Sequence, residues 1–287
     1  MAHVVPGPAG PPSLGPDGFD WTAWDPDLTV VAGVAALGGL YVALLLRGRA
    51  QGRRVKGVKV ISFFAGLAVL LGSLTGPLHN LADYYLFSAH MVQHLLLVFA
   101  MPPLLLYGTP GWMLSPLLRH PLVLSLGRRL TRPSGAFASF NLVLVAWHLP
   151  PLYNLAKDHH GTHIVQHLMI IVVSVILWWP VMSPSPEELP RAPYPVQMLY
   201  LFVVGLPMVV VSIFITMAGS VLYPYYATAP RVWEALTPHA DQHLGGLIMW
   251  IPGGLVFLIA ISVVFFRWQA AGGQDGAIAP LGASHGR

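Results

Sequence analysis

Three short segments repeat one pattern, His-x-x-Gln-His-Leu: "HMVQHL" at 90–95, "HIVQHL" at 163–168 and "HADQHL" at 239–244. The chain has 13 histidines in 287 residues, and these copies contain six of them. A spacing of four residues puts both imidazoles of a copy on one helix face, about 6 Å apart along the axis. Neutral imidazole binds Cu, Zn, Ni and Fe, so each pair suits a two-ligand metal clip. The candidate ligands in the copies are His90, His94, His163, His167, His239 and His243.

The elements that must position these pairs are strongly apolar. Hydrophobic residues make up 55% of the chain and charged residues only 9%, with a mean hydropathy of +0.64, which is too apolar for a soluble domain. A membrane-spanning helix needs about 20 mainly apolar residues. We predict an all-α bundle of seven spans in a membrane domain at 28–267, between disordered tails at 1–27 and 268–287. The predicted spans are 28–46, 58–76, 84–107, 135–149, 163–182, 196–219 and 243–266.

Basic residues predict the orientation of these spans. When the connections are assigned to alternate sides, thirteen of the 15 Lys and Arg residues fall on one side. The other side receives only Lys157 and Arg231. Cytoplasmic loops are enriched in Lys and Arg, so we expect the N-terminus outside and the C-terminus in the cytoplasm. The start of the chain lacks the basic and apolar regions of a cleavable signal peptide.

With this orientation, the three copies begin the third, fifth and seventh spans at the outer face. Each follows the end of an even-numbered span, so the bundle is expected to consist of pseudo-repeated helix pairs whose histidines converge on one outward-facing pocket. His79 in "GPLHN" and His148 in "WHLPPLYN" fall on the same side and are included as candidate ligands. The groups that are candidates to orient the imidazoles are Gln93, Gln166, Gln242, Asp83, Asp158, Asp241 and Glu234.

Other kinds of chemistry are not indicated. The chain has no cysteine, which excludes disulfides and thiolate ligands. It shows no phosphate-binding glycine loop, nucleophile elbow or paired carboxylates within the spans, so we expect no catalytic residues and no enzyme. No lysine lies in a span core, which argues against a retinal protein. The net charge of +4 reflects membrane-flanking loops that contact lipid rather than nucleic acid.

The segment "SAHMVQHLLLVFAMPPLLLYGTP" at 88–110 resembles the CtaG family of bacterial caa-type cytochrome c oxidase assembly factors. "PLHNLADYYLF" before it, and "WHLPPLYN" and "HIVQHL" after it, extend the resemblance over residues 55–267. It implies a multi-pass protein of the bacterial plasma membrane that helps the oxidase to mature through copper delivery. The resemblance carries over His90, His94, His163 and His167, whereas His239 and His243 rest on the internal repeat.

The expected function is therefore assistance in copper-centre maturation, with copper-bearing oxidase subunits as partners. Subunit II of the oxidase holds its copper in an extracytoplasmic domain, which an outer histidine site would face. Zinc remains open as the metal, as does the oligomeric state. One alternative is a haem-binding electron carrier, which takes one axial His from each of two helices. Another is a metal transporter, for which the inner halves of the spans offer few polar groups, namely Ser174, Ser212, Thr216 and Ser262.

Overall fold

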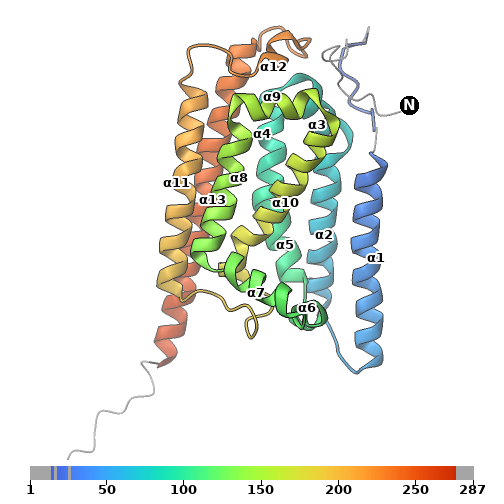
Figure 1. The fold of residues 1–287 in the computed structure, drawn as a ribbon, viewed down its shortest axis with the longest axis vertical. Helices are drawn as coiled ribbons and strands as arrows, with labels where there is room; N and C mark the ends of the chain where they lie inside the picture. The colour runs from blue at the N-terminus through green and yellow to red at the C-terminus, as the bar shows by residue number, and fades with distance from the viewer. Residues whose placement is uncertain (1–13, 16–17, 25–26, 276–287) are drawn as a thin grey trace, which may run out of the picture.

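The computed structural model describes residues 14–15, 18–24 and 27–275. As predicted, the described part of the chain is all-α: long helices run side by side, and short helices lie across both ends of the bundle (Figure 1). The helices are α1 (Leu28–Ala50), α2 (Gly57–Leu74), α3 (Gly76–Asn80), the π-helical turn η1 (Leu81–Tyr85), α4 (Phe87–Leu95), the π-helical turn η2 (Leu96–Ala100), α5 (Met101–Gly108), α6 (Gly111–Leu118), α7 (Pro121–Leu130), α8 (Pro133–His148), α9 (Pro150–Asp158), α10 (His160–Met182), α11 (Tyr194–Thr216), α12 (Pro224–Thr228) and α13 (Pro238–Asp275).

Six segments of the described chain are long and apolar enough to cross a membrane: α1, α2, Phe87–Gly108, α10, α11 and α13. A seventh candidate consists of α8 together with α9, which bend by 73° at their junction. Pro150 opens α9 and has no N–H to continue the hydrogen-bond ladder of α8, which explains the bend. The predicted fourth span corresponds to α8, and α9 lies across the end of the bundle (Figure 1).

The two ends of the bundle differ in composition. One end, called here the histidine end, carries α3, α9 and α12 and the first turns of α4, α10 and α13 (Figure 1). The opposite end carries α6 and α7, together with basic last turns in α1 (Arg47, Arg49) and α7 (Arg128, Arg129), and is called the basic end. The structure thus places the loops with most Lys and Arg opposite the three copies. The sidedness of the membrane stays a prediction from the charges.

The third span is interrupted where two prolines enter it. Pro102 and Pro103 have no N–H, so the carbonyl of Val98, four residues before Pro102, loses its helical partner, and the chain forms η2 just before them. The indole N–H of Trp178 on α10 donates to this carbonyl oxygen at 2.8 Å. Within a membrane, each backbone polar group needs such a partner. The contact therefore fixes α10 against the third span, on which the first histidine pair stands.

Helix α1 lies at the edge of the bundle, and few of its residues are buried. Its Tyr41 ring stacks on Phe63 of α2, with ring centroids 3.8 Å apart, and its hydroxyl donates to the carbonyl oxygen of Gly108 at 2.8 Å. A Cβ at Gly108 would come within 2.6 Å of the Phe63 backbone nitrogen, so glycine permits this close approach. The attachment lies toward the basic end and leaves space beside α1 nearer the histidine end.

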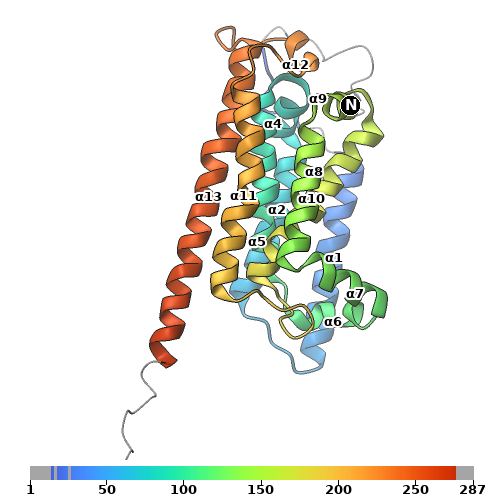
Figure 2. The ribbon, with the colours of Figure 1, turned by 60° about the vertical axis from the view of Figure 1, so that its left-hand side comes forward.

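Two ordered segments lie outside the predicted limits of the membrane domain. Residues 268–275, which the sequence assigns to a disordered tail, continue α13, and this helix projects past its neighbours (Figure 2). Phe19, within the other predicted tail, packs edge-on against Tyr85 with centroids 5.7 Å apart. The disorder predicted for 1–13, 16–17, 25–26 and 276–287 concerns positions outside the described residues.

Candidate metal centre

Two of the three histidine pairs meet inside the histidine end. His90 and His94 stand on α4, and His163 and His167 stand on α10; all four are buried. The ring of His167 lies 6.3 Å from that of His90, 6.3 Å from that of His94 and 4.5 Å from that of His163, measured between centroids. The spacing of four residues thus places each pair on the inner face of its helix, and the predicted convergence is found for these two copies.

The two single histidines join the same cluster. His79 of α3 lies 6.5 Å from His167 between ring centroids, and His148 at the end of α8 lies 5.9 Å from His94. Both are buried. The Nδ1 of His148 approaches the carbonyl oxygen of Leu144 at 2.6 Å, which fixes its ring plane. Four helices therefore supply six buried imidazoles, which we call the histidine cluster: His79, His90, His94, His148, His163 and His167.

The third pair does not join the cluster, so the prediction that all three pairs converge on one pocket was wrong. His239 and His243 are exposed, and their rings contact the carbonyl oxygens of Ala218 at 2.9 Å and Thr216 at 3.0 Å. The physical reason is the rotation of α13 about its axis: Asp241 and the residue after it face the bundle. His239 and His243 stand two residues before and after Asp241. At 100° per residue, each is rotated by about 160° from Asp241 and therefore points away from the bundle.

Asp241 takes a structural role that the sequence did not predict. Its carboxylate is fully buried and accepts hydrogen bonds from the backbone N–H of Phe87 at 2.7 Å and of Ser88 at 3.1 Å, and from the Ser88 hydroxyl. These N–H groups belong to the first turn of α4 and have no intrahelical partner. The third copy therefore anchors the helix that carries His90 and His94 instead of adding ligands to the cluster.

The glutamines of the copies also differ in role. Gln93 donates to the carbonyl oxygen of Ser73 at 2.6 Å, and its Nε2 lies 3.1 Å from His79 Nδ1. It therefore orients a histidine, as expected for this class of residue. Gln242 instead accepts from the backbone N–H of Leu222 at 2.6 Å and holds the loop before α12. The Nε2 of Gln166 is buried and has no hydrogen-bond partner among the described residues.

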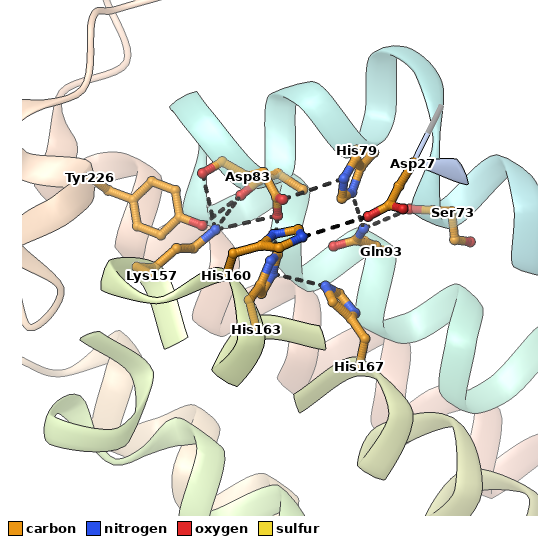
Figure 3. A network of polar contacts seen from close by, with 11 residues as sticks. Asp27, Ser73, His79, Asp83, Gln93, Lys157, His160, His163, His167 and Tyr226 are labelled. Atoms are coloured by element: carbon orange, nitrogen blue, oxygen red, sulfur yellow. Dashed lines mark hydrogen bonds and ion pairs between the residues drawn. The ribbon is translucent and has the colours of Figure 1, made fainter. Parts of the chain in front are cut away.

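The carboxylate of Asp83 lies at the middle of the polar contacts (Figure 3). Its Oδ1 is 3.4 Å from His163 Nε2 and 3.4 Å from Lys157 Nζ, and its Oδ2 is 3.4 Å from His79 Nε2. Burial alone raises the pKa of Asp83, but the positive charges that His163, His79 and Lys157 can carry outweigh burial and hold it well below its usual range. From the sequence, Asp83 was predicted only to orient an imidazole. Its spacing of four residues from His79, which puts both side chains on one helix face, was the one sequence feature that could have predicted its contact with a histidine.

Asp83, His163 and His167 form a group whose ligand atoms all lie within 4.8 Å of one another; we call it the Asp83 centre. The two Nε2 atoms are 2.9 Å apart, and His163 Nε2 is 3.4 Å from Asp83 Oδ1. Ligands at bond lengths of about 2.0–2.1 Å around a tetrahedral ion are separated by roughly 3.3 Å. Both separations are close to that value. The residues therefore fit a small cation held by two imidazoles and a carboxylate.

Several imidazole nitrogens near this centre have no partner among the described residues. They include both nitrogens of His90, Nε2 of His94, Nε2 of His148 and Nδ1 of His167, and each is fully shielded from solvent. Native proteins pair the large majority of buried polar atoms, so each exception needs an explanation. Binding of a cation by these nitrogens would supply one. On the far side of His94 and His148, a cavity of about 30 Å³ is lined by apolar side chains and by Met91, Met208 and Met249.

A pocket of about 370 Å³ connects the Asp83 centre with the side of the bundle. It lies between α1, α2 and α10 and is lined by apolar residues such as Val34 and Leu74, with His79, Asp83, His163 and His167 at its inner end. At its mouth, His160 Nε2 lies 3.9 Å from Asp27 Oδ2 (Figure 3). α1 contacts the rest of the bundle mainly through α2. A cation inside this pocket would lie beside the Asp83 centre.

Fold and site together define a multi-pass helical membrane protein with a buried histidine cluster at one end of its bundle. The chain belongs to the cytochrome c oxidase caa3 assembly factor family, whose pattern matches residues 39–271. This match contains the whole histidine cluster and Asp83. It confirms the family that the sequence motifs indicated.

Three curated relatives are mycobacterial proteins described as uncharacterized. The Mycobacterium leprae protein is 24% identical over 275 residues, which cover 86% of this chain and 40% of the relative. The proteins of Mycobacterium bovis and Mycobacterium tuberculosis are each 26% identical over 269 residues, covering 86% of this chain and 39% of the relative. The chain thus spans about 40% of the length of the curated relatives it matches. No solved structure matches the chain.

Proposed function

We propose that the protein assists assembly of a caa3-type oxidase by binding a copper ion at the Asp83 centre and releasing it for the copper centre of the enzyme. The observation that carries this proposal is the approach of three ligand atoms, from Asp83, His163 and His167, to within 4.8 Å of one another inside the bundle. Ionisable groups are costly within a membrane protein and mark functional sites there.

The donor set favours copper or zinc over harder cations. Two imidazole nitrogens and one carboxylate oxygen suit Cu and Zn, whereas Mg²⁺ and Ca²⁺ take mainly oxygen ligands. A site with three protein ligands leaves a coordination position free for exchange. His90, His94 and His148, whose unpartnered nitrogens lie close by, would accept the ion as it moves within the histidine cluster. Copper is therefore cargo in this proposal, and no reaction is assigned to it.

The position of the centre supports delivery on the outer side of the membrane. The distribution of Lys and Arg predicts that the basic end is cytoplasmic, so the histidine end would lie outside the plasma membrane. Copper-bearing subunits of the oxidase present their metal domain on that side. The proposed partners are those subunits, and the lateral pocket beside α1 is the proposed path for the ion.

Metal analysis of the detergent-purified protein tests this function. We expect about one copper per chain after loading, and loss of that copper in the double variant H163A/H167A. The matched control is H239A/H243A, because that pair has the same residues and spacing but lies outside the cluster. A control that retains copper while H163A/H167A loses it supports the assignment. Equal copper content in the wild type and H163A/H167A would overturn it.

An absorption spectrum of the same sample separates copper from haem. Bis-histidine haem needs two imidazoles from different helices with the macrocycle between them. His163 and His167 stand on the same helix, and the cavity beside His94 and His148, which stand on different helices, holds only about 30 Å³, far less than a macrocycle occupies. We therefore expect no Soret band. A strong band with reducible visible bands would replace the copper proposal by haem binding.

A further inference from the structure

Lys157 on α9 reaches the Asp83 centre from the opposite side to the histidines (Figure 3). The sequence counted it as an outer-loop cation, but only 4% of its surface is exposed. Its Nζ donates to the carbonyl oxygens of Ala82 at 3.3 Å and Asp83 at 3.0 Å, and to Asp83 Oδ1 at 3.4 Å. Three acceptors match the three N–H groups of an ammonium. These contacts favour the ammonium form of the amine.

Two aromatic rings complete this environment. Lys157 Nζ lies 5.2 Å from the ring centroid of Tyr226 and 5.5 Å from that of Tyr225. The Tyr226 hydroxyl donates to the Ala82 carbonyl oxygen at 2.6 Å and accepts from Tyr153 at 3.0 Å, so the ring is fixed in place. Cations bind favourably over such rings. The ammonium is thus a built-in feature of the centre rather than a mobile surface charge.

This ammonium changes the net charge that the centre offers to a metal. Histidine binds metal through neutral imidazole, so Asp83 and Lys157 are the charged groups in contact at the centre, and they cancel. Asp27, the other carboxylate lining the pocket, lies at the mouth beside His160. A monovalent ion would leave one uncompensated positive charge in this buried site, and a divalent ion would leave two. Burying charge without compensation is costly.

We propose that Lys157 makes the Asp83 centre selective for a monovalent soft cation, Cu⁺, over divalent ions of similar size and softness. This inference rests on the metal site of the proposed function, and it specifies the charge of the ion that the site binds. The ammonium and an ion bound to Asp83 Oδ1 share one carboxylate oxygen, so they would stand about 4–5 Å apart. At that separation, one additional unit charge lowers affinity by a factor of roughly 300 to 1,000 at an effective dielectric constant of about 20.

The test compares Ag⁺, a stable analogue of Cu⁺, with Cd²⁺, a soft divalent ion, so that charge differs more than softness. Equilibrium competition in chloride-free buffer gives both affinities for wild type, K157Q and K157R. The neutral K157Q variant should raise the Cd²⁺-to-Ag⁺ affinity ratio by roughly 300- to 1,000-fold. K157R keeps the charge and is the matched control, so its ratio should stay near that of the wild type.

An unchanged ratio in K157Q relative to K157R would overturn the selectivity role. If K157Q does not fold, the wild type alone decides, because equal affinities for Cd²⁺ and Ag⁺ would contradict the proposal. Binding and selectivity are separable in this experiment. A wild type that binds neither ion overturns the metal site and with it the proposed function, whereas binding of Ag⁺ and Cd²⁺ without discrimination leaves that function standing and removes only the selectivity.

Discussion

The carboxylate of Asp241 accepts the backbone N–H of Phe87 at 2.7 Å, so the last span holds the first turn of the helix that carries His90 and His94. The two residues are 154 positions apart in the chain. This contact explains why the third copy of the motif retains a buried polar residue although its histidines face outward. It also connects the stability of α4 to the arrangement of the histidine cluster.

Replacing Asp241 by Ala should lower both stability and metal binding. The change removes the acceptor for two first-turn N–H groups and for the Ser88 hydroxyl, and loss of a helix cap costs about 1–2 kcal/mol. Thermal unfolding in detergent measures the first effect, and copper stoichiometry measures the second. D158A, at an exposed aspartate of α9, is the control and should change neither. A D241A protein with unaltered melting and copper content would contradict the capping role.

Trp178 and Pro102 should show coupled effects on stability. W178F removes the donor to the Val98 carbonyl oxygen, and leaving a buried acceptor unsatisfied costs about 1–3 kcal/mol. In P102A, the restored backbone N–H can serve that carbonyl itself. We therefore expect W178F to cost less in the P102A background than in the wild type. Unfolding midpoints of the four proteins of this double-mutant cycle measure the coupling, and strict additivity would argue against it.

Acidification should release the metal through the histidines and not through Asp83. The pKa of Asp83 is held below its usual value, so the stability it contributes is present above the unfolded-state pKa of about 3.9 and is lost only as pH falls through the lower folded-state value. Burial disfavours the charged imidazolium, and imidazolium does not bind metal, so copper should be retained at about pH 6.5 and lost only in more acidic buffer. Copper content after dialysis at a series of pH values from about 7.5 downward measures this release, and circular dichroism checks the fold at each step. Loss of copper only together with the fold would contradict release through the histidines.

Filling the lateral pocket should slow metal entry without changing the bound amount. Gly33 of α1 lines this pocket, and a Cβ there meets nothing within 4 Å, so G33L can be accommodated while its side chain occupies the path. Gly39 on the same helix is equally open but does not line the pocket, which makes G39L the control. The rate of Ag⁺ uptake, followed by rapid mixing, should fall in G33L only. Equal rates in both variants would place the entry path elsewhere.

The fold was largely predictable from the sequence because membrane spans need long apolar segments. Such segments can be recognised from local composition, without knowledge of contacts between distant residues. Histidine pairs four residues apart also gave the relative orientation of two imidazoles within one helix, correctly for His90 with His94 and for His163 with His167. Periodicity does not give the rotation of a helix about its own axis. That rotation is set by packing, and it turns His239 and His243 away from the cluster.

The partners of the histidines were harder to predict. Asp83 and Lys157 lie 74 positions apart and on helices whose approach depends on the bend at Pro150. A lysine between two predicted spans reads as a solvated loop residue from sequence alone, because nothing local signals that α9 turns across the end of the bundle. The charged pair therefore appears only when the chain is seen in three dimensions.

The anchoring of α4 by Asp241 also has a consequence for the order of biogenesis. All the residues of the histidine cluster are synthesised by His167, yet the first turn of α4 lacks its cap until α13 has entered the membrane. A nascent chain that stopped after α11 would hold every ligand but not the contact that sets the helix carrying His90 and His94. The two histidines of α4 would then take their final positions only after the last helix is in place, so the complete histidine cluster forms after the Asp83 centre.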